Sequence, residues 1–141
     1  RMEKITRGVL HSMLPDGWEL WVDGAHNTGG AEMVAAHIKT QWQDKPTYLI
    51  NGRTGQRDIG GFLSYFKGLV EFVCGVKVVS EPLGELAINI VKGAKVAGLE
   101  AFECGDLKDA LQTILKRAQK PGRVLICGSL YLAADVARVN L

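Results

Sequence analysis

The sequence has little that would indicate a metal, nucleic-acid or membrane site. Its 141 residues include only 3 Cys and 3 His, with no Cys-x-x-Cys spacing, so no metal centre is predicted. The 17 Lys and Arg residues are scattered and the net charge is only +2, which argues against a nucleic-acid surface. No apolar stretch approaches membrane-spanning length, and no signal-peptide pattern opens the chain.

The few cysteines also indicate the redox environment. Cys74, Cys104 and Cys127 are widely spaced, and each lies in or beside an apolar segment that resembles a strand. This placement predicts buried free thiols rather than disulfides. A cytoplasmic location follows from that prediction.

The composition is that of an ordinary globular domain. Hydrophobic residues make up 47% of the chain and charged residues 23%, which suits one domain spanning residues 1–141. The chain begins at Arg1 without an initiator Met, and the residues that follow read like the interior of a protein. We therefore expect the chain to be a piece of a longer protein.

Short apolar segments alternate with segments of helical periodicity. The strands are predicted at residues 9–13, 19–22, 47–50, 76–79, 99–102 and 124–127. The helices are predicted at residues 31–42, 59–66, 86–97, 107–118 and 130–139, with Asp106 as the N-cap of the fourth.

This order of elements predicts the architecture. Strands that alternate with helices form a mostly parallel sheet covered on both faces, which is a three-layer, Rossmann-like α/β fold. The turn sequence Pro-Asp-Gly at residues 15–17 predicts that the first two strands pair as an antiparallel hairpin at one edge. We expect about six strands in one sheet.

The segment at residues 23–30 is the first candidate site, because ligands of open α/β sheets bind beyond the carboxyl ends of strands. Its small residues allow backbone amides to approach a ligand, and the helix that follows favours negative charge. Asp23 can accept hydrogen bonds from ribose hydroxyls, and His26 and Asn27 can donate to an anion. The segment lacks the Lys of a Walker A loop. An ordinary turn with Asp23 or Asn27 as a cap is an equal alternative.

Two further loops follow predicted strands. Ser129, after the last strand, is either the N-cap of the final helix or a group that holds a carboxylate, and no His or acid beside it suggests a nucleophile. Arg57 and Asp58 lie in a polar loop after the strand at residues 47–50. They either contact a partner domain or substrate, or belong to a solvated loop.

The chain resembles folylpolyglutamate synthases and dihydrofolate synthases of the Mur ligase superfamily, in their C-terminal domain only. Residues 23–27 match the Asp-Gly-Ala-His-Asn signature, and residues 128–131 match the closing Gly-Ser-Leu-Tyr motif. Residues 1–3 resemble an upstream Gly-Arg-x-Glu pattern. The loop at residues 51–58 resembles one that often carries Lys-Asp, and Arg57 departs from it.

The resemblance implies an ATP-dependent ligase of folate metabolism that adds L-glutamate to folate or dihydropteroate through an acyl phosphate. Asp23 would contact the ATP ribose and Arg1 the phosphates. His26 would bind ATP with Asn27 and orient the reacting groups, and Ser129 would bind glutamate with His26. The Walker A loop and the Mg²⁺ ligands would lie in an absent N-terminal ATPase domain. We expect a monomer whose isolated C-terminal domain is inactive.

Two alternatives remain open from the sequence. The chain is compatible with the C-terminal domain of another Mur-type amide ligase, which acts on peptidoglycan-like or cyanophycin-like substrates. It is also compatible with a non-catalytic α/β binding module.

Overall fold

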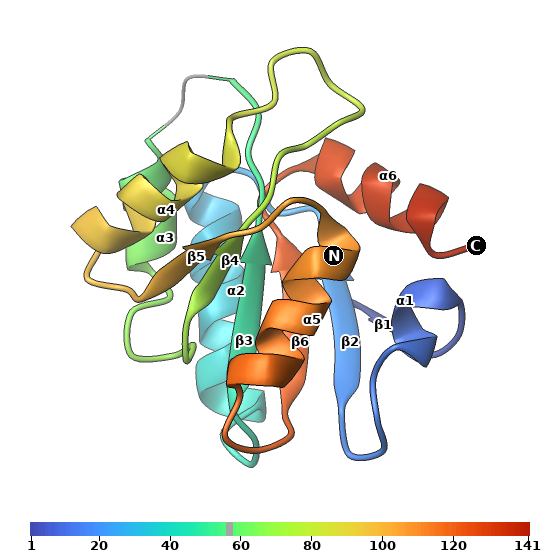
Figure 1. Cartoon of the computed structure of the whole chain (residues 1–141). Helices are drawn as coiled ribbons and strands as arrows, with labels where there is room; N and C mark the ends of the chain where they lie inside the picture. The colour runs from blue at the N-terminus through green and yellow to red at the C-terminus, as the bar shows by residue number, and fades with distance from the viewer. Residues whose placement is uncertain (56–57) are drawn as a thin grey trace.

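In the computed structural model, which describes residues 1–55 and 58–141, a six-stranded sheet runs through the centre of the chain (Figure 1). The strands lie in the order β1-β2-β6-β3-β4-β5; β1 and β2 are antiparallel, and the other neighbouring pairs are parallel. The strands are β1 (Glu3–Ile5), β2 (Glu19–Asp23), β3 (Thr47–Asn51), β4 (Val73–Gly75), β5 (Ala101–Glu103) and β6 (Arg123–Cys127).

Helices cover both faces of the sheet, so the predicted three-layer α/β fold is confirmed. The helices are α1 (Val9–Ser12), α2 (Thr28–Gln41), α3 (Ile59–Ser64), α4 (Ala87–Val96), α5 (Leu107–Arg117) and α6 (Leu130–Val139). One core cluster joins the sheet to α2, α3 and α4, and the other joins it to α1, α5 and α6. Figure 1 shows α5 in front of the strands and α2 behind them.

The two central strands are buried along their whole length. Every residue of β3 and β6 is buried, and Leu49, Ile50, Leu125 and Ile126 have no exposed surface. Apolar residues follow one another without alternation in these strands because helices cover both faces of a parallel sheet. This burial fixes the carboxyl ends of β3 and β6, from which the candidate site is built.

Side-chain caps set the beginnings of two helices. Asn27 Oδ1 accepts a hydrogen bond from the Gly30 amide at 2.8 Å, so α2 begins at Thr28, three residues before the predicted start. Asp106 Oδ1 accepts from the Asp109 amide at 2.7 Å, which confirms Asp106 as the N-cap of α5.

The prediction of a strand at residues 9–13 was wrong. This segment forms α1, and the antiparallel partner of β2 is β1, so the predicted hairpin through Pro15 to Gly17 was also wrong. The Leu10 amide donates to Asn140 Oδ1 at 2.8 Å, and the Leu10 side chain is fully buried. A hydrogen bond to the far end of the chain therefore satisfies a backbone amide in the first turn of α1. The sequence of residues 9–13 alone does not reveal such a contact.

The strand predicted at residues 76–79 was also misplaced, because β4 is Val73–Gly75. Val76 and Val78 are buried at 1% and 0% exposure, and they fill the core just beyond the end of the strand pairing. These two valines are therefore apolar because they are buried, and not because they belong to a strand of the sheet. The remaining strand and helix predictions match the observed elements, with ends that differ by three residues or fewer.

The three cysteines are buried and free, as predicted.

Among residues 1–55 and 58–141, the structure contains no helix with both the length and the apolar character needed to cross a bilayer.

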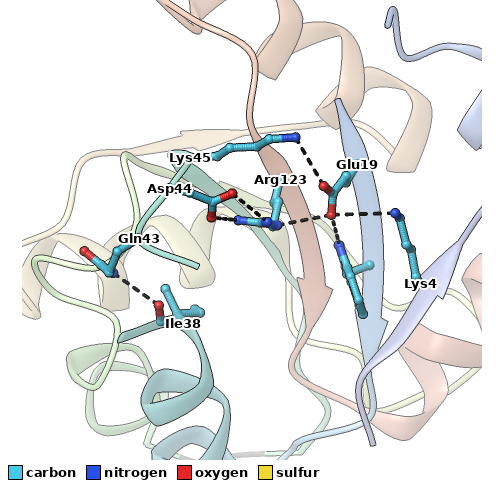
Figure 2. Close-up of polar contacts among 8 residues, drawn as sticks. Lys4, Glu19, Ile38, Gln43, Asp44, Lys45 and Arg123 are labelled. Carbon is cyan, nitrogen blue, oxygen red and sulfur yellow. Dashed lines mark hydrogen bonds and ion pairs between the residues drawn. The ribbon is translucent and has the colours of Figure 1, made fainter. Parts of the chain in front are cut away.

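A network of charged side chains joins the amino-terminal ends of the central strands (Figure 2). Arg123 Nε donates to Glu19 Oε1 at 3.1 Å, and Arg123 Nη1 donates to Asp44 Oδ1 at 2.8 Å. Glu19 also accepts from Trp21 Nε1 at 2.9 Å and from Lys45 Nζ at 3.2 Å. The network ties β2 and β6 to the loop that precedes β3, at the end of the sheet opposite the candidate site.

These contacts change the titration of both acids. Burial opposes ionisation of Glu19, but hydrogen bonds from Trp21, Lys45 and Arg123 outweigh it and leave the pKa of Glu19 below its usual value. The hydrogen bond from Arg123 lowers the pKa of Asp44. A carboxyl group whose pKa is lower in the folded state contributes stability above its unfolded pKa and loses it as the pH falls.

We therefore expect the free energy of unfolding to decrease as the pH falls below about 4, where unfolded Asp and Glu become protonated. An Arg123→Met variant should be less stable at pH 7 by about 2 kcal/mol, because it breaks charge-assisted hydrogen bonds. It should also lose less stability on acidification than the wild type. Urea unfolding at pH 7 and at pH 3.5 measures both effects.

Lys4→Met is the matched control for this prediction. Lys4 lies 4.0 Å from Glu19 Oε1 and its side chain is 48% exposed. Removing it should change stability at pH 7 by less than about 0.5 kcal/mol. If Arg123→Met kept the full acid sensitivity of the wild type, the network would not be its source.

Candidate functional site

The candidate site lies where three parallel strands end side by side. Asp23, Cys127 and Asn51 are the last residues of β2, β6 and β3, and they are aligned across the sheet as register partners. All three are buried, with Asp23 at 7% exposure and the other two at 0%. The predicted position of Asp23 at the carboxyl edge of the sheet matches this arrangement, and the loops after β2, β3 and β6 meet above it.

The two carboxylate oxygens of Asp23 have different surroundings. Oδ1 accepts a hydrogen bond from the Ala25 amide at 2.7 Å, which fixes the turn that leaves β2. Oδ2 lies 3.2 Å from the backbone amino group of Arg1, and both residues line the cavity described below. One oxygen therefore shapes the loop, and the other is presented to donors outside it.

His26 and Asn27 come next on the same loop. The His26 side chain is half-buried, and its Nδ1 lies 3.3 Å from the Gly24 carbonyl oxygen, which orients the ring. Asn27 is exposed and caps α2 through its Oδ1, so the capping interpretation of Asn27 is confirmed. The Asn27 Nδ2 group can still donate to an anion at the same helix end.

A first cavity, of about 370 Å³, opens beside Asp23, and we call it the Asp23 cavity. The loop after β2, the start of α2 and the amino-terminal residues form most of its wall. It is lined by Arg1, Met2, Asp23, Gly24, Ala25, His26, Asn27, Gly30, Met33, Val34, His37 and Leu130. The structure thus brings together Arg1, Asp23, His26 and Asn27, the residues predicted for nucleotide binding.

A second cavity, of about 190 Å³, lies over the end of β6, and we call it the Ser129 cavity. It is lined by His26, Thr54, Gly128, Ser129, Leu130 and Tyr131. His26 and Leu130 line both cavities. The imidazole therefore stands at the junction between the two.

Leu130 connects the two loops that form these cavities. A Cβ on Gly24 would lie only 2.6 Å from Leu130 Cδ2, so glycine at this position lets the start of α6 pack on the loop after β2. The relative position of His26 and Ser129 follows from this contact.

Ser129 is the N-cap of α6. Its Oγ accepts a hydrogen bond from the Tyr131 amide at 3.0 Å, and the residue is 1% exposed, so the capping interpretation is confirmed. The hydroxyl hydrogen is not used in this bond and can be donated to a ligand. The helix end behind it favours negative charge.

The second polar loop contributes differently. Asp58 is exposed and caps α3 by accepting from the Gly61 amide at 2.8 Å. Arg57 lies outside the described residues. The predicted contact of these two residues with a partner domain or substrate remains a prediction.

The sequence analysis did not single out Met33, His37, Thr54 or Tyr131, all of which line a cavity. Met33 and His37 lie one helical turn apart and share a face of α2 with Gly30, so helical spacing from the Asp-Gly-Ala-His-Asn loop would have identified them. Thr54 carries no such signal, because its place depends on pairing between Thr54 and Gly84.

The residues around the two cavities are suited to binding and orienting ligands rather than to nucleophilic attack. Burial, together with the nearby Asp23 carboxylate, raises the pKa of the Cys127 thiol, which keeps it protonated and unreactive. Among the described residues, no group of three or more His, Cys, Asp or Glu side chains is arranged to hold a metal ion.

A larger groove, of about 870 Å³, lies elsewhere, over the carboxyl end of α5 and the sequence that follows it. Tyr48, Phe72 and Phe102 form its floor, and charged side chains form its rim. It lies at the amino-terminal end of the strands, whereas ligands of open α/β sheets bind beyond the carboxyl ends. We therefore assign the candidate site to the two smaller cavities.

The fold and these cavities define an α/β domain whose candidate site lies at the carboxyl edge of a mostly parallel sheet. Comparison with protein families is more specific. The model of the Mur ligase, glutamate ligase domain matches residues 1–130, so the chain belongs to this family of Mur ligase C-terminal domains. No curated protein matches the chain in sequence.

Solved structures share the fold at low sequence identity. E. coli FolC in complex with DHPP and ADP superposes with a TM-score of 0.74 at 21% identity, covering 89% of this chain and 29% of that one. Folylpolyglutamate synthase from Thermotoga maritima gives a TM-score of 0.74 at 22% identity, covering 98% and 29%. The Mycobacterium tuberculosis folylpolyglutamate synthase complexed with ADP and AMPPCP gives 0.73 at 16%, covering 87% and 30%. The chain thus spans less than a third of these proteins.

Because Asn27 caps the helix beneath the Asp23 cavity, we expect an Asn27→Ala variant to lower the free energy of unfolding by about 1 kcal/mol. An Asn27→Ser variant should recover most of this loss, since serine also caps. Urea unfolding of the three proteins measures the effect. Equal stability of all three would show that the cap contributes nothing.

Proposed function

We propose that the chain is the C-terminal domain of an ATP-dependent ligase that adds L-glutamate to folate or dihydropteroate. The observation that carries this proposal is that His26 lines both cavities. One cavity carries the features expected for a nucleotide, and the other has the size and helix end expected for an amino acid. A ligase of this kind must bring exactly these two ligand classes to one reacting centre.

The Asp23 cavity fits the sugar and phosphate end of a nucleotide. Asp23 lines the cavity, and its Oδ2, which makes no bond to the loop after β2, is an acceptor for ribose hydroxyls. Arg1 and the amino-terminal end of the 14-residue α2 supply positive potential for phosphates. Asn27 Nδ2 adds a donor at the same end of the helix. The structures of E. coli FolC with DHPP and ADP and of a Yersinia pestis relative with AMPPNP and Mn support a nucleotide as a ligand of the proposed ligase.

The Ser129 cavity fits the amino-acid substrate. The Ser129 hydroxyl and the amino-terminal end of α6 favour a carboxylate, and His26 can donate to the same ligand. Its volume of about 190 Å³ suits a small molecule rather than a nucleotide. A bifunctional folylpolyglutamate synthase/dihydrofolate synthase has been crystallised with Mn, AMPPNP and L-glutamate bound, which supports glutamate as the substrate.

In the proposed reaction, this domain orients the reacting groups and shields the acyl phosphate from water. The γ-phosphoryl group of ATP passes to the acceptor carboxylate, which releases ADP and forms an acyl phosphate. The glutamate amine then attacks the acyl carbon, forms the C–N bond and gives up a proton to solvent, while the C–O bond to phosphate breaks and phosphate leaves with its electron pair. His26 orients the groups at the junction, and closure of the domain over the acyl phosphate excludes water.

The parts that this chain does not supply belong to a second domain in this proposal. The segment at residues 23–30 lacks the Lys of a Walker A loop, and the described residues hold no cluster of metal-binding side chains. We therefore assign the phosphate-binding loop and the Mg²⁺ ligands to an N-terminal ATPase domain. Bound there, Mg²⁺ would neutralise charge on the transferred phosphoryl group.

In the intact ligase, we expect Asp23→Ala to raise the KM for ATP about tenfold or more, because a buried acceptor for the ribose is lost. We expect His26→Ala to lower kcat about a hundredfold, because the reacting groups lose a positioned donor. Steady-state ligation assays with ATP, L-glutamate and dihydropteroate or folate measure both. The isolated chain should show no ligation.

Asp16→Ala is the control, since Asp16 is an exposed acid in the turn before β2. It should retain wild-type kinetics. Wild-type rates from both site variants, with folded proteins, would contradict the assigned roles. Ligation of UDP-linked peptides in place of folates would contradict the proposed substrate.

A further inference from the structure

Asn51 is a fully buried amide at the centre of the carboxyl edge of the sheet. It ends β3, beside Cys127 at the end of β6, and the chain continues from Cys127 into the turn that carries Ser129. Its backbone carbonyl accepts a hydrogen bond from the Val76 amide at 3.0 Å, and its side chain reaches across to β6. The side chain therefore links the loop after β3 with the loop after β6.

The link is made at the turn that carries Ser129. Asn51 Nδ2 donates to the Cys127 carbonyl oxygen at 2.8 Å. Gly128 packs directly on this amide at a φ of 138°, and a Cβ there would lie 2.5 Å from Asn51 Nδ2 and would clash with the Gly52 carbonyl oxygen. The turn thus follows the shape of the Asn51 side chain, and only glycine allows the approach.

Stability alone does not account for an amide at this position. Within residues 1–55 and 58–141, Asn51 Oδ1 has no hydrogen-bond partner although it is buried. A buried acceptor without a partner costs free energy, and an apolar side chain of similar size would avoid that cost. The donated bond to Cys127 is therefore the feature that distinguishes asparagine from leucine here.

The contact lies between the two segments that line the Ser129 cavity. Thr54 reaches this cavity from the segment after β3, and Ser129 reaches it from the segment after β6. The Asn51 amide and the Gly128 backbone lie between the bases of these two segments. A change in that contact moves the two walls relative to each other.

We propose that Asn51 is a positioning residue that fixes the Gly128–Ser129 turn so that the Ser129 cavity fits the amino-acid substrate of the ligase. This inference rests on the proposed function, because it takes the occupant of the cavity to be L-glutamate. Asn51 acts through the turn and does not touch the substrate.

The first test uses Asn51→Leu in the intact ligase, which keeps the size of the side chain and removes its donor. The KM for L-glutamate should rise about tenfold or more, whereas the KM for ATP and kcat at saturating glutamate should stay within about twofold. Thr47→Val is the matched control. Thr47 is buried at the other end of β3, and its Oγ1 has no hydrogen-bond partner among the described residues. The control should leave all three parameters unchanged.

The second test uses Asn51→Asp, in case the leucine variant does not fold. A protonated aspartic acid can donate to the Cys127 carbonyl oxygen, and an ionised one cannot. The KM for L-glutamate of this variant should therefore rise with pH relative to that of the wild type. If the ratio of the KM of Asn51→Asp to the KM of the wild type did not change with pH, the role of Asn51 would be purely structural. That result would overturn the proposal.

Hydrogen exchange separates failure of this inference from failure of the proposed function. In this chain, protection of the Tyr131 amide, which bonds to Ser129 Oγ, should fall about tenfold in Asn51→Leu and stay unchanged in Thr47→Val. If the wild-type ligase does not use glutamate, the proposed function fails, and exchange still shows whether Asn51 holds the turn. If it uses glutamate and the leucine variant keeps its KM, the inference about Asn51 fails.

Discussion

The alignment of β2, β6 and β3 at their carboxyl ends is the constraint on which the site depends. It places Asp23, Cys127 and Asn51 in one row, all buried, and lets three loops rise from adjacent points. The complete burial of β3 and β6 between two helical layers stabilises this alignment. It is held at the opposite end by Arg123, which bridges Glu19 and Asp44. The two cavities depend on this row, because the Asp23 cavity opens beside the end of β2 and the Ser129 cavity lies over the end of β6.

Two small contacts turn the row into a site whose two cavities share His26 and Leu130. Glycine at position 24 lets Leu130 pack on the loop after β2, and glycine at position 128 lets the last turn pack on Asn51. Together they place His26 against both cavities. A domain that must hold a nucleotide on one side and an amino acid on the other gains from such an arrangement, because proximity supplies much of the effect of an enzyme on a two-substrate reaction.

Much of the fold was predictable, because short apolar segments and helical periodicity are local signals. The six elements β2, β3, β6, α4, α5 and α6 were predicted within one residue at each end. The Asp-Gly-Ala-His-Asn and Gly-Ser-Leu-Tyr motifs identified both site loops. What failed was decided by contacts between distant residues. Residues 9–13 became a helix whose first turn bonds to Asn140, and Val76 and Val78 became core beyond the pairing of β4 with β5. The place of Thr54 likewise depends on Gly84, which local sequence does not indicate.

The central claim is that nucleotide and amino acid meet at His26 from opposite cavities. A crystal structure of the intact ligase with a non-hydrolysable ATP analogue and L-glutamate tests it most directly. We expect the ribose within hydrogen-bond distance of Asp23, the glutamate in the Ser129 cavity, and the imidazole of His26 in contact with both ligands. A nucleotide or a glutamate bound away from this carboxyl edge, with His26 touching neither, would contradict the account.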